Sequence, residues 1–336
     1  MTESLDLTLI QNEIEKELAA CIGFSNDQRY TEYEAIFTYQ MDWENDPYTK
    51  RGKRVRPFLL LLTTHAVGGV WQRALPAAAS LELMHNFSLI HDDIQDQSDS
   101  RRGKPTIWVK WGEPLAINGG DAMLTLSSLA LQRLLALYPA PLVAEVAAIT
   151  QTACLNLTRG QFLDISFETR QSVGLDDYWE MISGKTCALL AASMEIGAIL
   201  GGTEAAQCAV FHNCGLSLGK AYQVQDDWLG IWGNDALTGK SNQSDLMARK
   251  KSYPILLGLA KEGAFSDLWS RTQEITPVQI PALVQALEAD GVKAETEAQM
   301  DLLYRQTITL LDSLPYSAVR MLPLRTHLNK LMNRAQ

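Results

Sequence analysis

The sequence predicts an all-α fold in a single domain. Apolar residues recur at three- and four-residue spacings along most of the chain, while no segment alternates convincingly as a strand, and Gly and Pro clusters separate the periodic stretches. Of the 336 residues, 46% are hydrophobic and 20% are charged, which is enough to build a large core. We therefore predict one bundle of long helices over residues 1–336.

The periodic segments predict a succession of helices. Residues 5–20 read as an amphipathic helix, because acids stand where a secretory signal would carry a basic patch. The longest apolar run, residues 187–202, is rich in small residues and interrupted by Glu195, so we expect a buried helix and no transmembrane segment. The predicted helices cover residues 5–20, 58–66, 74–93, 116–137, 142–167, 178–200, 205–230, 253–261, 277–290 and 295–314.

Charge and cysteine usage exclude several classes of protein. A net charge of -10 disfavours nucleic-acid binding, because phosphate backbones favour basic surfaces. The five cysteines are scattered, with no CxxC pair and no nearby histidine at metal-ligand spacing. This argues against a zinc site or a disulfide framework, and we expect a cytoplasmic protein.

The helix expected over residues 74–93 ends in a cluster of acids. Asp92 and Asp96 lie one turn apart with Asp93 beside them, and the turn-like segment QSDSRRGKPT follows. A helix C-terminus carries partial negative charge and disfavours acids. We therefore expect something positive at this position.

A second helix, residues 205–230, repeats this layout. Gln223, Asp226, Asp227 and Gly230 follow at i, i+3, i+4 and i+7 before GIWGN stops the helix. A single acidic cluster is best explained as a solvated helix end, but two on otherwise apolar helices weaken that explanation. Oxygen ligands without His or Cys select Mg²⁺, which shares its coordination shell with substrate phosphates. The predicted chemistry is diphosphate handling.

Basic residues accompany both clusters. GKRVRP precedes one predicted helix, and Lys185 lies in GKT within an otherwise apolar helix, where an unpaired lysine is rare. Residues 238–254, TGKSNQSDLMARKKSYP, have the Gly- and Ser-rich composition of a mobile lid over phosphate. These cations suit direct contacts to a diphosphate.

Together, GKRVRP, HNFSLIHDDIQD with RRGKPT, GKT, and YQVQDDWLGIWG with TGKSNQSDL and KKSYP resemble the trans-isoprenyl diphosphate synthase family over residues 50–255. The resemblance implies a helical bundle around a central cavity, two aspartate motifs facing each other across its mouth, and a homodimer. It also implies substrates of two kinds, isopentenyl diphosphate and an allylic diphosphate.

The resemblance carries site roles onto individual positions. The isopentenyl diphosphate positions are Lys53, Arg56, His85 and Arg102. The allylic diphosphate positions are Arg101, Lys185, Thr186, Gln223, Lys240 and Lys250. The Mg²⁺ positions, for three ions with diphosphate bound, are Asp92, Asp96 and Asp226, with Asp227 and Asp245 as direct or water-mediated helpers.

This sequence departs from the family pattern twice. Gly230 replaces the usual last aspartate of the second motif, and Trp108 stands where a histidine is common. Two alternatives stay open: a class I terpene cyclase, which needs no isopentenyl diphosphate site, and a noncatalytic partner subunit. The altered DDWLG motif keeps the cyclase open, but the intact Lys53, Arg56, His85 and Arg102 argue against it. A noncatalytic subunit should have lost the first-motif acids or the basic set, and this sequence retains both.

The implied mechanism is ionisation followed by condensation. Asp92, Asp96 and Asp226 with their metals, together with Arg101, Lys185 and Lys240, stabilise the departing diphosphate. Isopentenyl diphosphate then attacks the allylic cation.

Product length is expected to depend on residues upstream of Asp92. Phe87 lies five residues before it, with small Ser88 beside it and Met84 one turn further from the metals. One aromatic at the deeper position, without an insertion in DDIQD, resembles twenty-carbon synthases. We therefore expect geranylgeranyl diphosphate, with farnesyl diphosphate second.

Overall fold

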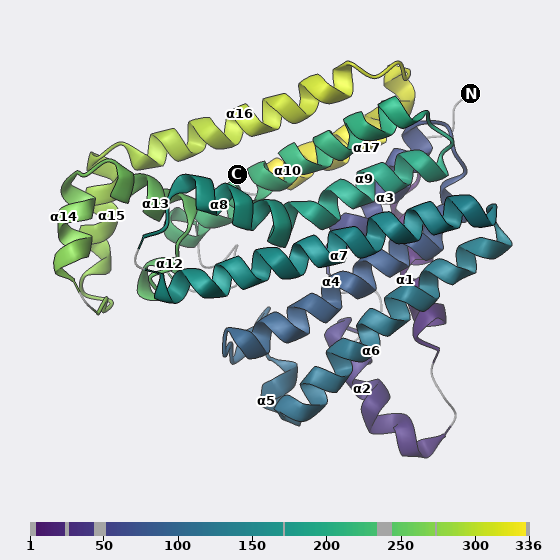
Figure 1. Cartoon of the computed structure of the whole chain (residues 1–336), viewed down its shortest axis with the longest axis horizontal. Helices are drawn as coiled ribbons and strands as arrows, with labels where there is room; N and C mark the ends of the chain where they lie inside the picture. The colour runs from purple at the N-terminus through teal and green to yellow at the C-terminus, as the bar shows by residue number, and fades with distance from the viewer. Residues whose placement is uncertain are drawn as a thin grey trace. The chain divides into compact units, whose positions relative to one another are not determined.

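A computed structural model describes residues 5–23, 27–43, 52–170, 172–233, 244–272 and 274–333 (Figure 1). It confirms the all-α prediction. From the N-terminus the elements are α1 (Leu7–Ile22), η1 (Gln28–Tyr30), α2 (Thr31–Gln40), α3 (Val55–Ala66), η2 (Trp71–Ala74), α4 (Leu75–Gln95), β1 (Ser100–Arg101), β2 (Lys104–Pro105), α5 (Ile107–Trp111), α6 (Glu113–Gln132) and η3 (Arg133–Ala136). They continue as α7 (Ala140–Thr169), α8 (Leu175–Ile182), the π-helix η4 (Ser183–Cys187), α9 (Ala188–Leu200), α10 (Ala205–Trp232), α12 (Ser244–Met247), α13 (Tyr253–Ala260), α14 (Ala264–Arg271), α15 (Ile280–Ala289), α16 (Val292–Asp312) and α17 (Ala318–Met332).

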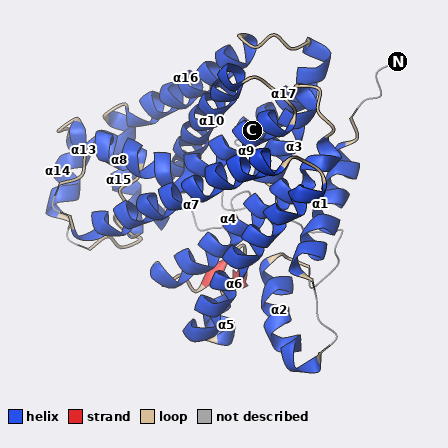
Figure 2. Ribbon diagram, turned by 45° about the vertical axis from the view of Figure 1, so that its right-hand side comes forward, coloured by secondary structure: helices blue, strands red, loops and turns tan. Residues whose placement is uncertain are grey.

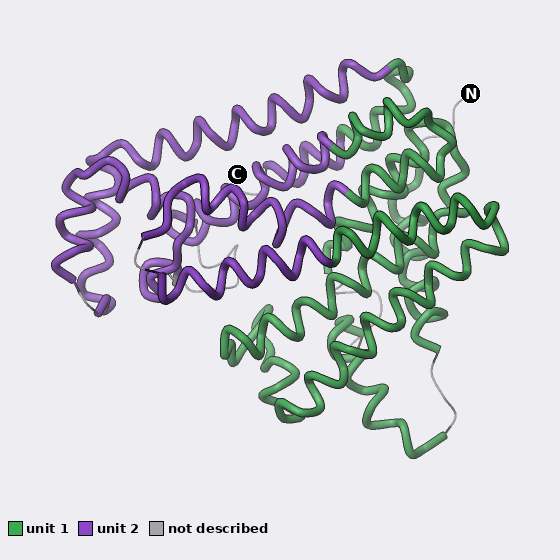
Figure 3. Tube along the Cα trace, in the orientation of Figure 1, with its two compact units in different colours: residues 1–154, 192–212, 315–325 green, residues 155–191, 213–314, 326–336 purple. Residues whose placement is uncertain are grey.

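The chain falls into two compact units (Figure 3). Unit 1 comprises residues 1–154, 192–212 and 315–325, and unit 2 comprises residues 155–191, 213–314 and 326–336. Each carries one of the two aspartate motifs. The extent of one domain over residues 1–336 stays a prediction.

Unit 1 is built around α4, which packs against α1, α3 and α6. On α3, Leu59, Leu60, Leu61 and Leu62 are all fully buried, so this helix has no solvent-facing side in that turn. A Cβ on Gly120 of α6 would lie 2.3 Å from His91 Nε2 on α4, so a larger residue at this position would have to displace the His91 ring.

A two-residue hairpin interrupts the helices after α4, and Figure 2 shows it in red. β1 pairs antiparallel with β2, and the loop residues Arg102 and Gly103 have φ of 54° and 78°. Two consecutive positive φ values fit the tight turn that joins twisted strands. The sequence did not predict this hairpin, because four paired residues are too few to show alternation.

Unit 2 has its own core where α13, α14, α15 and α16 pack together. Phe265, Leu283, Leu287 and Val292 are fully buried there. The helix predicted over residues 178–200 begins at Leu175 and changes to π geometry over Ser183–Cys187.

Two helical stretches, Ala140–Thr169 and Leu175–Leu200, are long and apolar enough to cross a bilayer by length and composition alone. In Leu175–Leu200, 72% of the apolar window is buried within the chain, which confirms the expected buried helix. In Ala140–Thr169 the share is only 33%, so apolar side chains of α7 face outward.

Candidate active site

The acids at the end of α4 meet the positive partner that the sequence predicted. Asp93 is 2% exposed, and its carboxylate accepts hydrogen bonds from Arg101 Nε at 2.9 and 3.0 Å, with Nη2 at 2.7 Å. The β-hairpin thus places Arg101 against the C-terminal end of α4. Asp92 is half-buried one residue earlier, and Asp96 is the exposed C-cap residue.

The same hairpin presents a second pair of cations. Arg102 Nη1 donates to Asp42 Oδ2 at 2.9 Å, and Lys104 Nζ donates to Asp42 Oδ1 at 2.6 Å. Asp42 itself has φ of 62° just after α2. Sequence reasoning missed Asp42, because nothing in its local sequence indicates a partner sixty residues away.

Trp108, one of the two departures, has a structural partner. Its indole Nε1 donates to the carbonyl of Ser98 at 2.9 Å, and Thr106 Oγ1 donates to the same carbonyl at 2.8 Å. These bonds close the loop that carries the hairpin. Trp108 therefore supports the positions of Arg101 and Arg102.

His85 on α4 lies among arginines. Its pKa is held well below the usual value, first by burial and then by the positive charges of Arg56, Arg102, Arg101 and Arg54. The imidazole is therefore neutral at pH 7, and it can donate one hydrogen bond and accept another without adding positive charge to the site. The structure thus brings together three of the positions assigned to isopentenyl diphosphate, whereas Lys53 is exposed in the segment before α3.

The residues expected to set product length lie on the same helix. Met84 is fully buried, and Phe87 is 6% exposed with its ring edge-on to His91 at a centroid distance of 5.4 Å. Ser88 is buried and donates from Oγ to the carbonyl of His85 at 2.8 Å. Their role in chain length stays a prediction.

The second motif, on α10 in unit 2, is anchored through Asp227. This carboxylate is 2% exposed and accepts from Tyr178 Oη at 2.7 Å, the Tyr253 backbone N–H at 2.9 Å and Gln223 Nε2 at 2.9 Å. Burial raises the pKa of Asp227, and the negative charge of Asp245 adds to that shift, whereas Lys250 and the hydrogen bonds from Tyr253 and Tyr178 oppose it. Both of its oxygens are therefore used within the chain.

Lys250 lies among the carboxylates of unit 2. The negative charge of Asp245, and more weakly that of Asp227, Asp164 and Asp226, raises the pKa of its ammonium group. The second motif thus has a permanent cation at hand. The lid was predicted over residues 238–254. Lys240 and the other residues of 238–243 lie outside the described residues, whereas residues 244–254 contain α12 and the start of α13.

Asp245 lies beside Gly230, the position where the second motif lacks its usual last aspartate. A Cβ built on Gly230 would lie 2.8 Å from Asp245 Oδ2 and 3.0 Å from its Cγ. The carboxylate of α12 therefore fills the space of a side chain at position 230.

The π-helix presents Lys185 and Thr186. Lys185 Nζ donates to Asp164 on α7, and Thr186 Oγ1 donates to Gln223 Oε1 at 2.6 Å, which continues the bond from Gln223 to Asp227. A Cβ on Gly160 would lie only 2.1 Å from the Lys185 backbone nitrogen. Single π turns are frequent at functional sites, where they shift side chains from the α-helical register.

Asp164 is a second residue that sequence reasoning missed. It is a carboxylate within a predicted helix that is otherwise mostly apolar, which is the signal that singled out Lys185. A polar pocket in unit 2 is lined by Asp164, Lys185, Thr186, Gln223, Asp227 and Lys250. The predicted allylic-site positions that the structure describes in this unit therefore lie together.

Within the described residues, no three His, Cys, Asp or Glu side chains form a ready metal cage. The donors are nevertheless of the right kind, since carboxylates are the protein ligands of Mg²⁺, which usually takes only one or two of them and completes its shell with waters and substrate phosphates.

Comparison with known proteins gives a consistent result. The model of the family described as "Polyprenyl synthetase" matches residues 44–279. The chain is 41% identical over 275 residues to a (2E,6E)-farnesyl diphosphate synthase from Mycobacterium tuberculosis, covering 79% of this chain and 76% of the relative. It is 38% identical over 246 residues to a geranylgeranyl diphosphate synthase from Methanosarcina mazei, covering 72% and 75%. The crystal structure of a geranylgeranyl pyrophosphate synthetase from Pyrococcus horikoshii matches with a TM-score of 0.86 at 30% identity, covering 97% of both chains.

Proposed function

Because this chain belongs to the polyprenyl synthetase family, we propose that it is a short-chain trans-prenyl diphosphate synthase that condenses isopentenyl diphosphate with an allylic diphosphate. The observation that carries the proposal is the cluster of Arg56, Arg101 and Arg102 around a neutral His85. A class I cyclase has no need of this second anion site.

The reaction begins with departure of the allylic diphosphate. Magnesium held by Asp92, Asp96 and Asp226 would neutralise the leaving group. Lys185 and Arg101 stabilise the negative charge that develops on the departing oxygens. Each is held in place by a hydrogen bond to a carboxylate, that of Asp164 for Lys185 and that of Asp93 for Arg101.

Isopentenyl diphosphate is held on the other side of the reaction by Lys53, Arg56, Arg102 and His85. Its double bond attacks the allylic carbon, one carbon–carbon bond forms, and a proton leaves to the released diphosphate. No side-chain base is needed.

The product is geranylgeranyl diphosphate, with farnesyl diphosphate second. The buried ring of Phe87 supports a floor at that depth, because it lies one helical turn and a half from Asp92 and is fixed against His91.

We also propose that the enzyme is a cytoplasmic homodimer. On α7, Leu155, Phe162 and Ile165 share one face, and Phe162 is 70% exposed. Rows of large apolar side chains in water are typical of subunit interfaces. All five cysteines are free, as expected in a reducing compartment. Light scattering that gave a stable, active monomer would contradict the dimer.

The test compares the two substrates in one variant. Arg56→Ala should raise the KM for isopentenyl diphosphate at least about tenfold while changing the KM for the allylic diphosphate less than about threefold. Lys110→Ala, which removes an exposed cation of unit 1, is the matched control and should change neither. Equal effects of Arg56→Ala on both substrates, or cyclic products without isopentenyl diphosphate, would favour the cyclase.

A further inference from the structure

Arg54 stands between two cations of the proposed site, Lys53 and Arg56, yet it faces the interior. Its side chain is 0% exposed, and its backbone has a φ of 43°, a left-handed conformation that non-glycine residues seldom adopt. Such a strained residue persists only when its surroundings hold it firmly.

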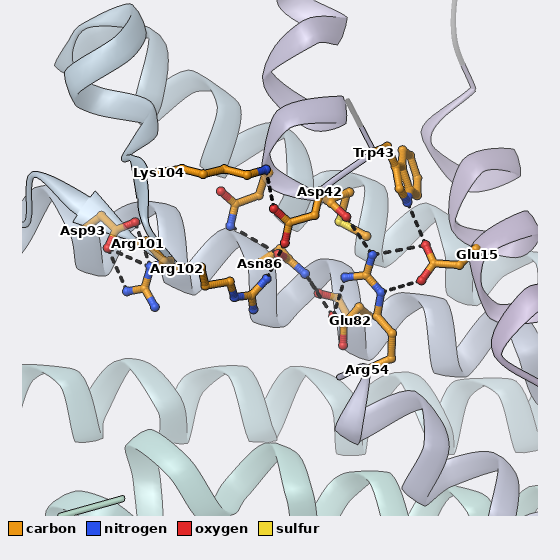
Figure 4. A network of polar contacts seen from close by, with 12 residues as sticks. Glu15, Asp42, Trp43, Arg54, Glu82, Asn86, Asp93, Arg101, Arg102 and Lys104 are labelled. Carbon is orange, nitrogen blue, oxygen red and sulfur yellow. Dashed lines mark hydrogen bonds and ion pairs between the residues drawn. The ribbon is translucent and has the colours of Figure 1, made fainter. Parts of the chain in front are cut away.

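The guanidinium of Arg54 is held from three directions (Figure 4). Nε and Nη2 donate to the two oxygens of Glu15 on α1 at 2.9 and 3.2 Å, and Nη1 donates to Glu82 on α4 at 3.1 Å. Nη2 also donates to the carbonyl of Met41 at 2.9 Å. This fork of bonds commits the Arg54 guanidinium to partners within the chain.

The partners of Arg54 are themselves fixed. Trp43 Nε1 donates to Glu15 Oε2 at 2.7 Å, and Asn86 Nδ2 donates to Glu82 Oε1 at 3.4 Å. Glu15 and Glu82 are 7% and 4% exposed. One arginine and two carboxylates therefore form a buried charged cluster, and Trp43 and Asn86 each donate a further hydrogen bond to one of its carboxylates (Figure 4).

This cluster is connected to the cations assigned to isopentenyl diphosphate through two neighbouring backbone segments. A Cβ on Gly52 would lie 3.1 Å from Arg102 Nη1 and 3.3 Å from Arg54 Nη1, so the segment leading into Lys53 is packed between the two arginines. Met41, which accepts from Arg54, precedes Asp42, which binds Arg102 and Lys104. The buried cluster is thus linked to the segment leading into Lys53 and, through the Met41–Asp42 backbone, to Arg102.

The carboxylates around these arginines have an electrostatic role. Arg54, Arg56, Arg101 and Arg102 all act on His85, so four positive charges gather in a small volume. They repel one another before any diphosphate binds. Glu15, Glu82, Asp42 and Asp93 offset this repulsion and fix where the cations lie.

We propose that Arg54, clamped by Glu15 and Glu82, is a positioning residue that preorganises the isopentenyl diphosphate site without touching the substrate. The inference rests on the proposed function. It predicts that the buried cluster controls affinity for isopentenyl diphosphate and not for the allylic substrate, because Lys185 and its partners belong to another part of the chain.

The test uses the triple variant Arg54→Met, Glu15→Gln, Glu82→Gln, which removes all three charges so that none is left buried and unpaired. Isothermal calorimetry with isopentenyl diphosphate alone measures binding without turnover. We expect its Kd to rise about tenfold or more, equivalent to ~1.4 kcal/mol. The KM for the allylic diphosphate should change less than about twofold.

Two further variants keep the test decisive. Ile10→Ala on α1 empties a fully buried position outside the cluster, so it lowers the Tm but should leave this Kd unchanged. Arg54→Lys keeps the charge but cannot bridge both carboxylates, and we expect an intermediate rise in Kd even if the triple variant does not fold.

Unchanged binding in Arg54→Lys or in a folded triple variant would overturn the inference. So would an equal rise in Kd for Ile10→Ala at the same loss of Tm. If the wild-type enzyme neither binds nor condenses isopentenyl diphosphate, the proposed function fails instead.

Discussion

Restoring the missing aspartate of the second motif should harm this enzyme. Gly230→Asp recreates the usual motif, and a comparison of motifs alone would expect tighter metal binding. In the structure, however, the new Cβ would lie 2.8 Å from Asp245 Oδ2 and 3.0 Å from Cγ, closer than real side chains tolerate. Asp245 must move, and this alters its electrostatic interaction with Lys250, whose pKa it raises more than any other group does.

Opposing terms set the change in the free energy of unfolding that Gly230→Asp causes. Replacing a helical glycine gains up to ~1 kcal/mol, whereas inserting a group into an occupied space costs about 1–3 kcal/mol. A new carboxylate beside Asp226 and Asp245 at a helix C-terminus adds like-charge repulsion. We expect kcat/KM for the allylic diphosphate to fall about tenfold, or ~1.4 kcal/mol in the barrier.

The control moves the carboxylate without adding one. Asp245→Ala alone should also lower kcat/KM, and Gly230→Asp with Asp245→Ala should recover part of the loss, because the acid returns to the same place from α10. Steady-state kinetics at several Mg²⁺ concentrations and calorimetric Tm measure both effects. A higher kcat/KM for Gly230→Asp than for the wild type would refute this prediction. So would a double variant whose kcat/KM is no higher than the product of the two single effects.

Three other outcomes are expected. Asp226→Asn should lower kcat at least about a hundredfold with little change in Tm, because an acid at a helix C-terminus serves function more than stability; near-normal turnover in saturating Mg²⁺ would contradict this. Phe87→Ala should lengthen the products and cost about 3–5 kcal/mol of stability; an unchanged product in a folded, active variant would make Phe87 ordinary core. Burial lowers the pKa of His327 from 6.5 to about 4, so the unfolded chain binds a proton in this window that the folded chain does not, and the free energy of unfolding should fall as the pH drops from 6.5 to 4. A Tm titration in which His327→Gln shows the same slope as the wild type would exclude this contribution.

Much of the fold and the acid positions could be predicted from local sequence. Helical periodicity located α4, α7 and α10 to within a few residues, because each buries an apolar face continuously. The acids stood out because α4 and α10 are otherwise mostly apolar. The π-helix at Ser183–Cys187 could not be predicted, because a shift in hydrogen-bond register leaves no change in composition.

The ion-pair partners could not be predicted for a different reason. Arg54 binds Glu15 and Glu82, and Arg102 binds Asp42, each across many residues of chain. Such pairs depend on which helices pack together, and a single sequence does not contain that information. The close approach of Asp245 to Gly230 is likewise visible only once α12 is placed beside α10.

Condensation itself tests the proposed synthase function most directly. Purified enzyme with Mg²⁺ would be incubated with labelled isopentenyl diphosphate and, in turn, dimethylallyl, geranyl or farnesyl diphosphate, and the products sized by chromatography after removal of phosphate. Label should appear in linear chains that stop at twenty carbons, each longer than its starter by whole isoprene units. Allylic substrate consumed to cyclic or hydrolysed products without incorporation of label would contradict this function.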